Sequence, residues 1–178
     1  LDPRYGKDGV ARGEDVPSGA TTALAYDDSD RLLLLRSEFG EDDLLHVVRY
    51  DAAGKVDPSY RQRKPIPLTL APEGGELHVQ PLADGSAVVS VSALCALSDC
   101  PFDYDAPGKV SRYLFKLRAD GDLDTTFASG KGFLTFPSPA RKGTLATYGT
   151  QITRSPEGEV VIAVDQPKGA VDVSWLSP

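Results

Sequence analysis

The sequence predicts an all-β protein built from repeated four-stranded sheets, and three observations support this prediction. One short motif, made of an apolar residue, an Asp, two turn-prone residues and an aromatic, occurs three times, starting at Leu1, Val56 and Leu123. Short apolar runs alternate with turn signals such as Asp-Gly and Glu-Gly, which is typical of β-hairpins. No segment has the 3.6-residue periodicity of an amphipathic helix.

The motif recurs at a spacing typical of stacked supersecondary units, with its aspartates at Asp2, Asp57 and Asp124. Before the second and third motifs, β-branched and aromatic residues end in an Asp/Ala/Gly cluster, which predicts a strand that enters a tight polar turn. These strand-and-turn segments are residues 44–54 and 113–121.

Hairpins are also expected upstream of these strands. They are predicted at residues 23–35, 77–91 and 150–164, and a further short strand follows each complete motif at residues 66–70 and 133–136. Two of the predicted strands, residues 32–35 and 160–164, are continuous apolar runs. Such runs are expected for strands that are covered on both faces.

Each unit therefore holds about four strands in a meander, which is how a β-propeller blade is built. A β-sandwich would not need the same motif after every third strand. We predict about three four-stranded antiparallel blades, as a partial ring or as part of a larger propeller. The predicted boundaries are a partial repeat at residues 1–14, repeats at about 15–72 and 73–140, and an incomplete repeat at about 141–178.

The repeated motif residues are predicted to be structural. The Asp is interpreted as a turn residue that accepts hydrogen bonds from the backbone N–H groups after it. The aromatic is expected to pack between adjacent blades. The residues in question are Asp2, Tyr5, Asp57, Tyr60, Asp124 and Phe127.

Residues 115–127, with Gly130 and Gly132 after them, resemble the delta-60 repeat of bacterial β-propeller proteins. That pattern is a strand, a polar turn with Asp-Gly, then Leu-Asp-x-x-Phe and a glycine-rich exit. The second copy matches from Tyr50 through Tyr60 but lacks the glycine that follows the aromatic. The resemblance implies a propeller, usually in large secreted or surface proteins, and it carries over no catalytic residue.

Three blades are too few to close a ring, which needs at least four. An open arc leaves strand edges and sheet faces uncovered, and such surfaces favour association. We therefore expect a protein partner, further copies of the same chain, or further repeats to complete the ring. Residues 1–14 are candidates for the strand that the last repeat lacks, pairing head to tail.

Composition excludes several kinds of partner. The formal net charge is −7 and the basic residues are scattered, whereas nucleic-acid binding requires a basic stripe. No apolar run is long enough to span a bilayer. No metal or cofactor is predicted, because the run from Asp120 to Asp124 lacks the Gly and Glu of an EF-hand loop, at whose places stand Thr125 and Lys131.

The second repeat is longer than the first, because the segment from Gly85 to Asp124 exceeds the matching segment from Asp30 to Asp57. The excess falls around residues 95–108, within which Cys95 and Cys100 are predicted to form a disulfide, the alternative being free buried thiols. A disulfide implies an extracellular, cell-surface or periplasmic location. The candidate binding residues of this loop are Phe102, Asp103, Tyr104 and Asp105. The alternative is that the aromatic rings fill a groove against the neighbouring blade.

No catalytic motif is present. His46 and His78 both lie in apolar strands, and there is neither a Gly-x-Ser-x-Gly elbow nor a His-Glu-x-x-His pair. The expected function is a non-catalytic binding or assembly module of a secreted or surface bacterial protein. Two alternatives stay open. One is a structural subunit of a surface assembly, and the other is a propeller hydrolase or lyase that acts on polysaccharide, which requires His46 or His78 to line a pocket beside carboxylates.

Overall fold

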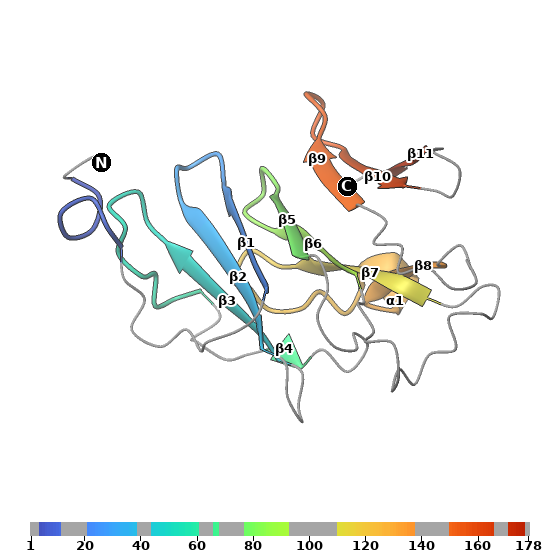
Figure 1. The fold of residues 1–178 in the computed structure, drawn as a ribbon, viewed down its shortest axis with the longest axis horizontal. Coiled ribbons are helices and arrows are strands. Elements are labelled where there is room, and N and C mark those ends of the chain that lie inside the picture. The colour runs from blue at the N-terminus through green and yellow to red at the C-terminus, as the bar shows by residue number, and fades with distance from the viewer. Residues whose placement is uncertain are drawn as a thin grey trace.

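The computed structural model describes residues 4–11, 21–38, 44–60, 66–67, 77–92, 110–137, 150–165 and 171–176. These residues form three antiparallel β-sheets, which confirms the all-β prediction (Figure 1). The only helix among them, α1 (Phe127–Gly130), has four residues, so no helix in the described part of the chain can cross a bilayer. Inside α1, Ala128 and Ser129 have left-handed backbone angles, so this element is a tight turn after the third motif rather than a regular helix.

Each sheet is a meander in which strands that follow one another along the chain are hydrogen-bonded neighbours. Sheet 1 contains β1 (Thr21–Tyr26), β2 (Leu32–Glu38), β3 (Leu44–Tyr50) and β4 (Ile66–Pro67). Sheet 2 contains β5 (Leu77–Pro81), β6 (Ala87–Ser92), β7 (Val110–Leu117) and β8 (Phe133–Pro137). Sheet 3 contains β9 (Thr150–Arg154), β10 (Val160–Asp165) and β11 (Val171–Leu176).

The described hairpin turns all have the same pattern of backbone hydrogen bonds. In each, the first residue donates its N–H to the carbonyl of the fifth, and the fourth residue donates its N–H to the carbonyl of the first, at 2.8–3.1 Å. The fourth residue has positive φ, which glycine adopts without strain. It is glycine in four turns and Asp30, at φ 56°, in the fifth. The turns are residues 27–31, 51–55, 82–86, 118–122 and 155–159.

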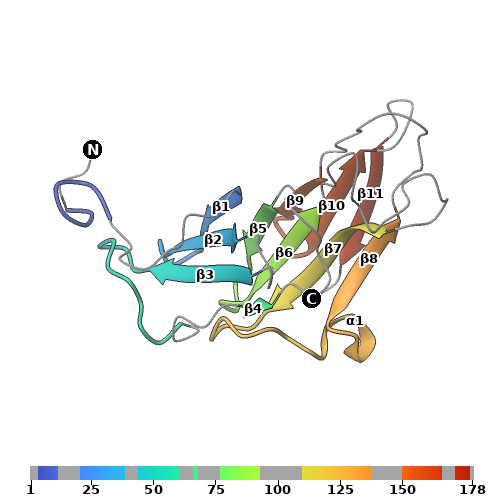
Figure 2. The same cartoon turned by 60° about the horizontal axis from the view of Figure 1, so that its bottom comes forward.

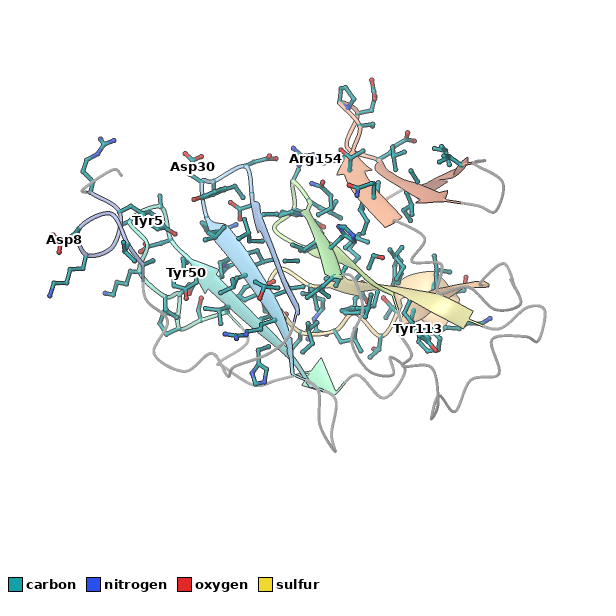
Figure 3. All side chains as sticks on the ribbon, in the orientation of Figure 1. Tyr5, Asp8, Asp30, Tyr50, Tyr113 and Arg154 are labelled. Carbon is teal, nitrogen blue, oxygen red and sulfur yellow. The ribbon has the colours of Figure 1, made fainter. Side chains whose placement is uncertain are left out.

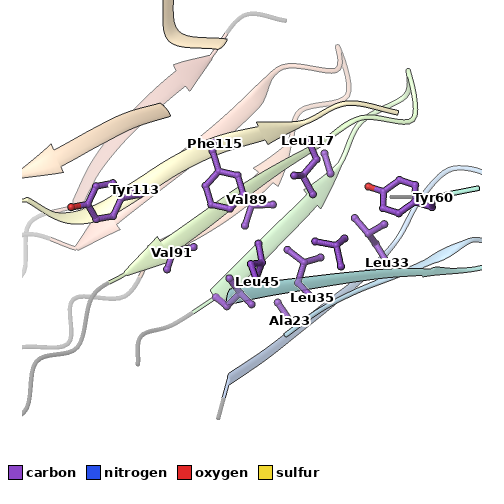
Figure 4. Close-up of a cluster of buried hydrophobic side chains, with 13 residues drawn as sticks. Ala23, Leu33, Leu35, Leu45, Tyr60, Val89, Val91, Tyr113, Phe115 and Leu117 are labelled. Atoms are coloured by element: carbon purple, nitrogen blue, oxygen red, sulfur yellow. The ribbon is translucent and has the colours of Figure 1, made fainter. Parts of the chain in front are cut away.

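The three sheets pack against one another through their first strands, because β5 contacts both β1 and β9 (Figure 2). A first apolar cluster fills the space between sheets 1 and 2, with Leu33 and Leu35 facing Val89 and Phe115 (Figure 4). Each such fully buried aliphatic side chain contributes on the order of 1.5–3 kcal/mol. A second cluster joins sheet 2 to sheet 3 and consists of Leu82, Val88, Leu114, Val160 and Ile162.

An ion pair connects sheet 3 to sheet 1 across the end of sheet 2. The Nη1 and Nη2 atoms of Arg154, at the end of β9, donate to the two carboxylate oxygens of Asp28 at 2.8 and 2.7 Å. Figure 3 labels Arg154 and also Asp30, which belongs to the same turn as Asp28. Arg154 and Asp28 are 126 positions apart in the sequence. The hairpin turns at this end of β1 and β9 are therefore close in space.

The prediction that residues 32–35 are covered on both faces is wrong. In β2, Leu33 and Leu35 are buried, but Leu32 and Leu34 are only half-buried. The strand that is buried at every position from Ala87 to Val91 is β6. The reason is the position of each sheet, since sheet 2 lies between the other two while sheets 1 and 3 each have a face that no described strand covers.

Candidate functional site

The second motif forms a compact polar turn after β3. The Asp57 N–H donates to the carbonyl of Arg49 at 2.8 Å, and Asp57 Oδ1 accepts the N–H and hydroxyl of Ser59 at 2.9 and 2.6 Å. Asp57 Oδ2 accepts hydrogen bonds from Nε and Nη2 of Arg49 at 3.0 and 2.7 Å. Partial burial opposes ionisation of Asp57, but these hydrogen bonds and the charge of Arg49 outweigh it and lower its pKa to about 2.

The third motif makes the same local contacts without the arginine. Asp124 donates its N–H to the carbonyl of Lys116 at 2.8 Å and accepts the N–H and hydroxyl of Thr126 at 3.0 and 2.6 Å. The hydrogen bond from the Thr126 hydroxyl is the main reason that the pKa of Asp124 lies below its ordinary value. Lys116 thus stands where the second motif has Arg49. Asp2, of the first motif, lies outside the described residues.

The aromatic of the second motif joins two sheets. Tyr60 is buried, and the guanidinium carbon of Arg49 lies 4.2 Å from the centre of its ring. The ring also lies against Gly121, in the turn that follows β7 of sheet 2. A Cβ built on Gly121 would be 2.6 Å from Tyr60 Cε1. Arg49 Nη1 also donates to the carbonyl of Ala119 at 3.2 Å, so the contact continues along the same turn.

Tyr5 makes the equivalent contact with the turn of sheet 1. A Cβ built on Gly54 would be 3.1 Å from the Tyr5 ring, and the Gly6 N–H donates to the carbonyl of Ala53 at 2.7 Å. Phe127, the third aromatic, is half-buried and packs with Ile152 against the cluster between sheets 2 and 3. Each of the three repeated aromatics therefore lies at a border between two parts of the fold.

Two apolar surfaces face away from sheet 2, and the strand registers show which residues belong to each surface. The outer face of sheet 1 carries side chains that pair across β1, β2 and β3, namely Leu24, Tyr26, Leu32, Leu34 and Val48. The outer face of sheet 3 carries Val161, Ala163, Val171 and Val173. On these faces the exposed fractions are 62% for Leu24, 59% for Tyr26 and 54% for both Val171 and Val173.

Sequence reasoning did not single out these faces. The relevant signal is present, because β1 and β2 carry apolar residues at positions on both faces of the sheet. The same reasoning did not assign a role to Arg49 or Gly121. Gly121 contacts Tyr60 and Arg49 contacts Ala119, and both contacts join segments that are far apart in the sequence.

The predicted loop site lies outside the described residues. This applies to the predicted disulfide partners Cys95 and Cys100 and to the candidate binding residues Phe102, Asp103, Tyr104 and Asp105. The predictions for this loop therefore remain predictions.

The two histidines do not share a surface. His46 is on the outer face of sheet 1, opposite Arg36 in register, while its neighbours Leu45 and Val47 are buried against sheet 2. His78 pairs with Ser90 on the face of sheet 2 that is turned toward sheet 3. Among the described residues, no group of three or more His, Cys, Asp or Glu side chains is arranged to hold a metal ion. The Asp120 carboxylate accepts the N–H of Asp122 and interacts with Arg118, as part of its own turn.

No protein-family model matches the chain, and no curated protein matches it significantly. Fold and contacts are therefore the basis of the functional inference.

Proposed function

We propose that the chain is a β-propeller-type array that serves as a non-catalytic assembly module of a secreted or surface bacterial protein. Three features support the propeller. The sheets are antiparallel meanders, and their hairpin turns have the same hydrogen-bond pattern. The first strands of the sheets also lie next to one another, as the first strands of blades do around a propeller axis. The delta-60 resemblance of residues 115–127 agrees with this proposal.

The observation that carries the assembly role is the exposed outer face of sheet 1. Leu24 and Tyr26 are more than half exposed, and Leu32, Leu34 and Val48 extend the same face across two further strands. Contiguous apolar patches of this kind mark protein–protein interaction sites. The outer face of sheet 3 is a second such surface, so the array offers one surface at each end.

The proposed role is tested by the size of the complex that the chain forms in its native host. Leu24→Lys places a charge in the outer face of sheet 1, and Val173→Asp does so in the outer face of sheet 3. Ala83→Lys is the control, because Ala83 is an exposed residue of a turn in sheet 2. We expect native electrophoresis to show a complex larger than the chain, which both face variants reduce and the control does not. Migration of the unmodified chain at its own mass would contradict the proposal.

A further inference from the structure

We infer that Asp28 and Arg154 form a salt-sensitive clasp that holds sheet 3 in place against the rest of the array. The clasp joins the hairpin turn at residues 27–31 of sheet 1 to the last residue of β9 in sheet 3. Its release would let sheet 3 open as a unit. Both residues belong to one chain, so the clasp does not depend on what covers the two outer faces.

The clasp connects two sheets that share no apolar cluster in the described part of the chain. The first cluster contains residues of sheets 1 and 2, and the second contains residues of sheets 2 and 3. Between the sheets, β5 of sheet 2 contacts both β1 and β9. The ion pair therefore crosses the end of sheet 2 and adds a direct connection that the clusters do not supply.

The interface between sheets 2 and 3 is the smaller of the two. Among the described residues, thirteen are buried in the cluster between sheets 1 and 2, and five in the cluster between sheets 2 and 3. The first interface also holds Tyr60, which lies on Gly121 and beside Arg49. At the equivalent places of the second interface, Lys116 replaces Arg49 and Phe127 is only half-buried. Because apolar burial is the main stabilising contribution, an added connection matters most for sheet 3.

The geometry of the pair suits a specific connection. Nη1 and Nη2 of Arg154 donate to the two carboxylate oxygens of Asp28 at 2.8 and 2.7 Å. Such paired hydrogen bonds between charged groups are stronger and more directional than a single one. The hydrogen bond from Arg154 is the main reason that the pKa of Asp28 lies below its ordinary value.

The turn that carries Asp28 leaves its carboxylate available. The neighbouring Asp27 accepts the N–H groups of Ser29 and Arg31 and also Nε of Arg31, so Asp27 and Arg31 are committed to the turn itself. The side chains of Asp28 and Arg154 are 57% and 26% exposed. Dissolved ions therefore reach the pair, and screening by salt weakens it.

The test is backbone hydrogen exchange of the purified 178-residue chain, followed by NMR. Amides of β10 report on sheet 3, because this strand is paired on both sides, and amides of β6 report on sheet 2. At low salt, Asp28→Ala and Arg154→Gln should each raise the exchange rates of β10 by about two- to fivefold and leave those of β6 unchanged. In 1 M salt, where screening acts within about 3 Å, the variants and the unmodified chain should exchange at the same rate.

Two further variants identify the ion pair as the cause. Glu157→Ala removes a negative charge from the exposed turn of sheet 3, and no ion pair among the described residues involves Glu157, so this control should leave the rates unchanged. Asp28→Arg combined with Arg154→Asp exchanges the two charges. This double variant should return the β10 rates to within about twofold of the unmodified chain. Circular dichroism establishes that each variant is folded.

Unchanged β10 rates in both single variants at low salt would overturn the inference. An increase that Glu157→Ala reproduces, or that the exchange of charges does not reverse, would overturn it as well, because the effect would then come from net charge or from distortion of a turn. Faster exchange of β2 without faster exchange of β10 would show that Asp28 stabilises its own hairpin, and this result would also contradict the clasp.

Discussion

The ring of Tyr60 lies directly on Gly121, so closely that a Cβ at Gly121 would stand 2.6 Å from Tyr60 Cε1. Tyr60 follows β3 of sheet 1, and Gly121 is in the turn after β7 of sheet 2. The absence of a side chain at position 121 is therefore a requirement of the contact between two sheets as well as of the turn. Tyr5 and Gly54 repeat this relationship at the border of sheet 1.

Gly121→Ala should destabilise the protein through both requirements. The residue has φ 86°, so alanine is strained by about 1–2 kcal/mol, and displacement of a buried ring adds roughly 1–3 kcal/mol. Gly158→Ala is the matched control, because Gly158 has φ 93° in an equivalent turn and no atom within 4 Å of its added Cβ. Urea denaturation should show a loss at Gly121 that exceeds the loss at Gly158. Equal losses would mean that the Tyr60 contact contributes nothing.

Tyr60→Phe should leave the free energy of unfolding unchanged or raise it by up to about 1 kcal/mol. Among the described residues, the buried Tyr60 hydroxyl has no hydrogen-bond partner, and the third motif has Phe127 at this place. Tyr60→Ala should cost about 3–5 kcal/mol, since it leaves a cavity between the sheets. Thermal unfolding of both variants checks the pair of values. A large loss on Tyr60→Phe would show that the hydroxyl is bonded in solution.

Asp57 should make folding stability depend on pH in acid. Its folded pKa of about 2 lies below the ordinary value, so its contribution is complete above about pH 4 and is lost as the pH falls toward 2. The contribution is on the order of 1–2 kcal/mol after allowance for solvent screening. The stability difference between the unmodified chain and Asp57→Asn should therefore shrink over this range. A difference that stays constant from pH 5 to pH 2 would contradict the assignment.

The pair of Arg49 and Asp57 should be energetically coupled, because the side chain of Arg49 is 9% exposed and contacts Asp57, Tyr60 and Ala119 together. A double-mutant cycle with alanine at both positions should give a coupling energy of about 1–2 kcal/mol. Arg118 and Asp122 are the control pair, with both side chains 50% exposed at 3.2 Å, and their coupling should be below about 0.5 kcal/mol. Similar coupling energies in the two double-mutant cycles would show that the burial of Arg49 beside Tyr60 does not strengthen its interaction with Asp57.

The local structure was predictable because its causes are local. Asp-Gly and Glu-Gly set the turns at Gly85 and Gly158, and the observed strands begin or end within a few residues of the predicted ones. The contacts between sheets were not predictable in the same way. β2 has apolar residues such as Leu33 and Leu34 at successive positions, so both of its faces are apolar. This pattern does not tell which of the two faces another sheet covers. The contact of Tyr60 with Gly121 requires the stacking of two sheets, which a single motif does not encode.

A crystal structure of the purified 178-residue chain is the most direct measurement of how its three sheets are arranged. We predict that the sheets stack in chain order, with Tyr60 on Gly121 between sheets 1 and 2 and with Ile162 of sheet 3 packed against sheet 2. Sheets that stack in another order, or a Tyr60 ring that lies away from Gly121, would contradict the proposed blade-like array.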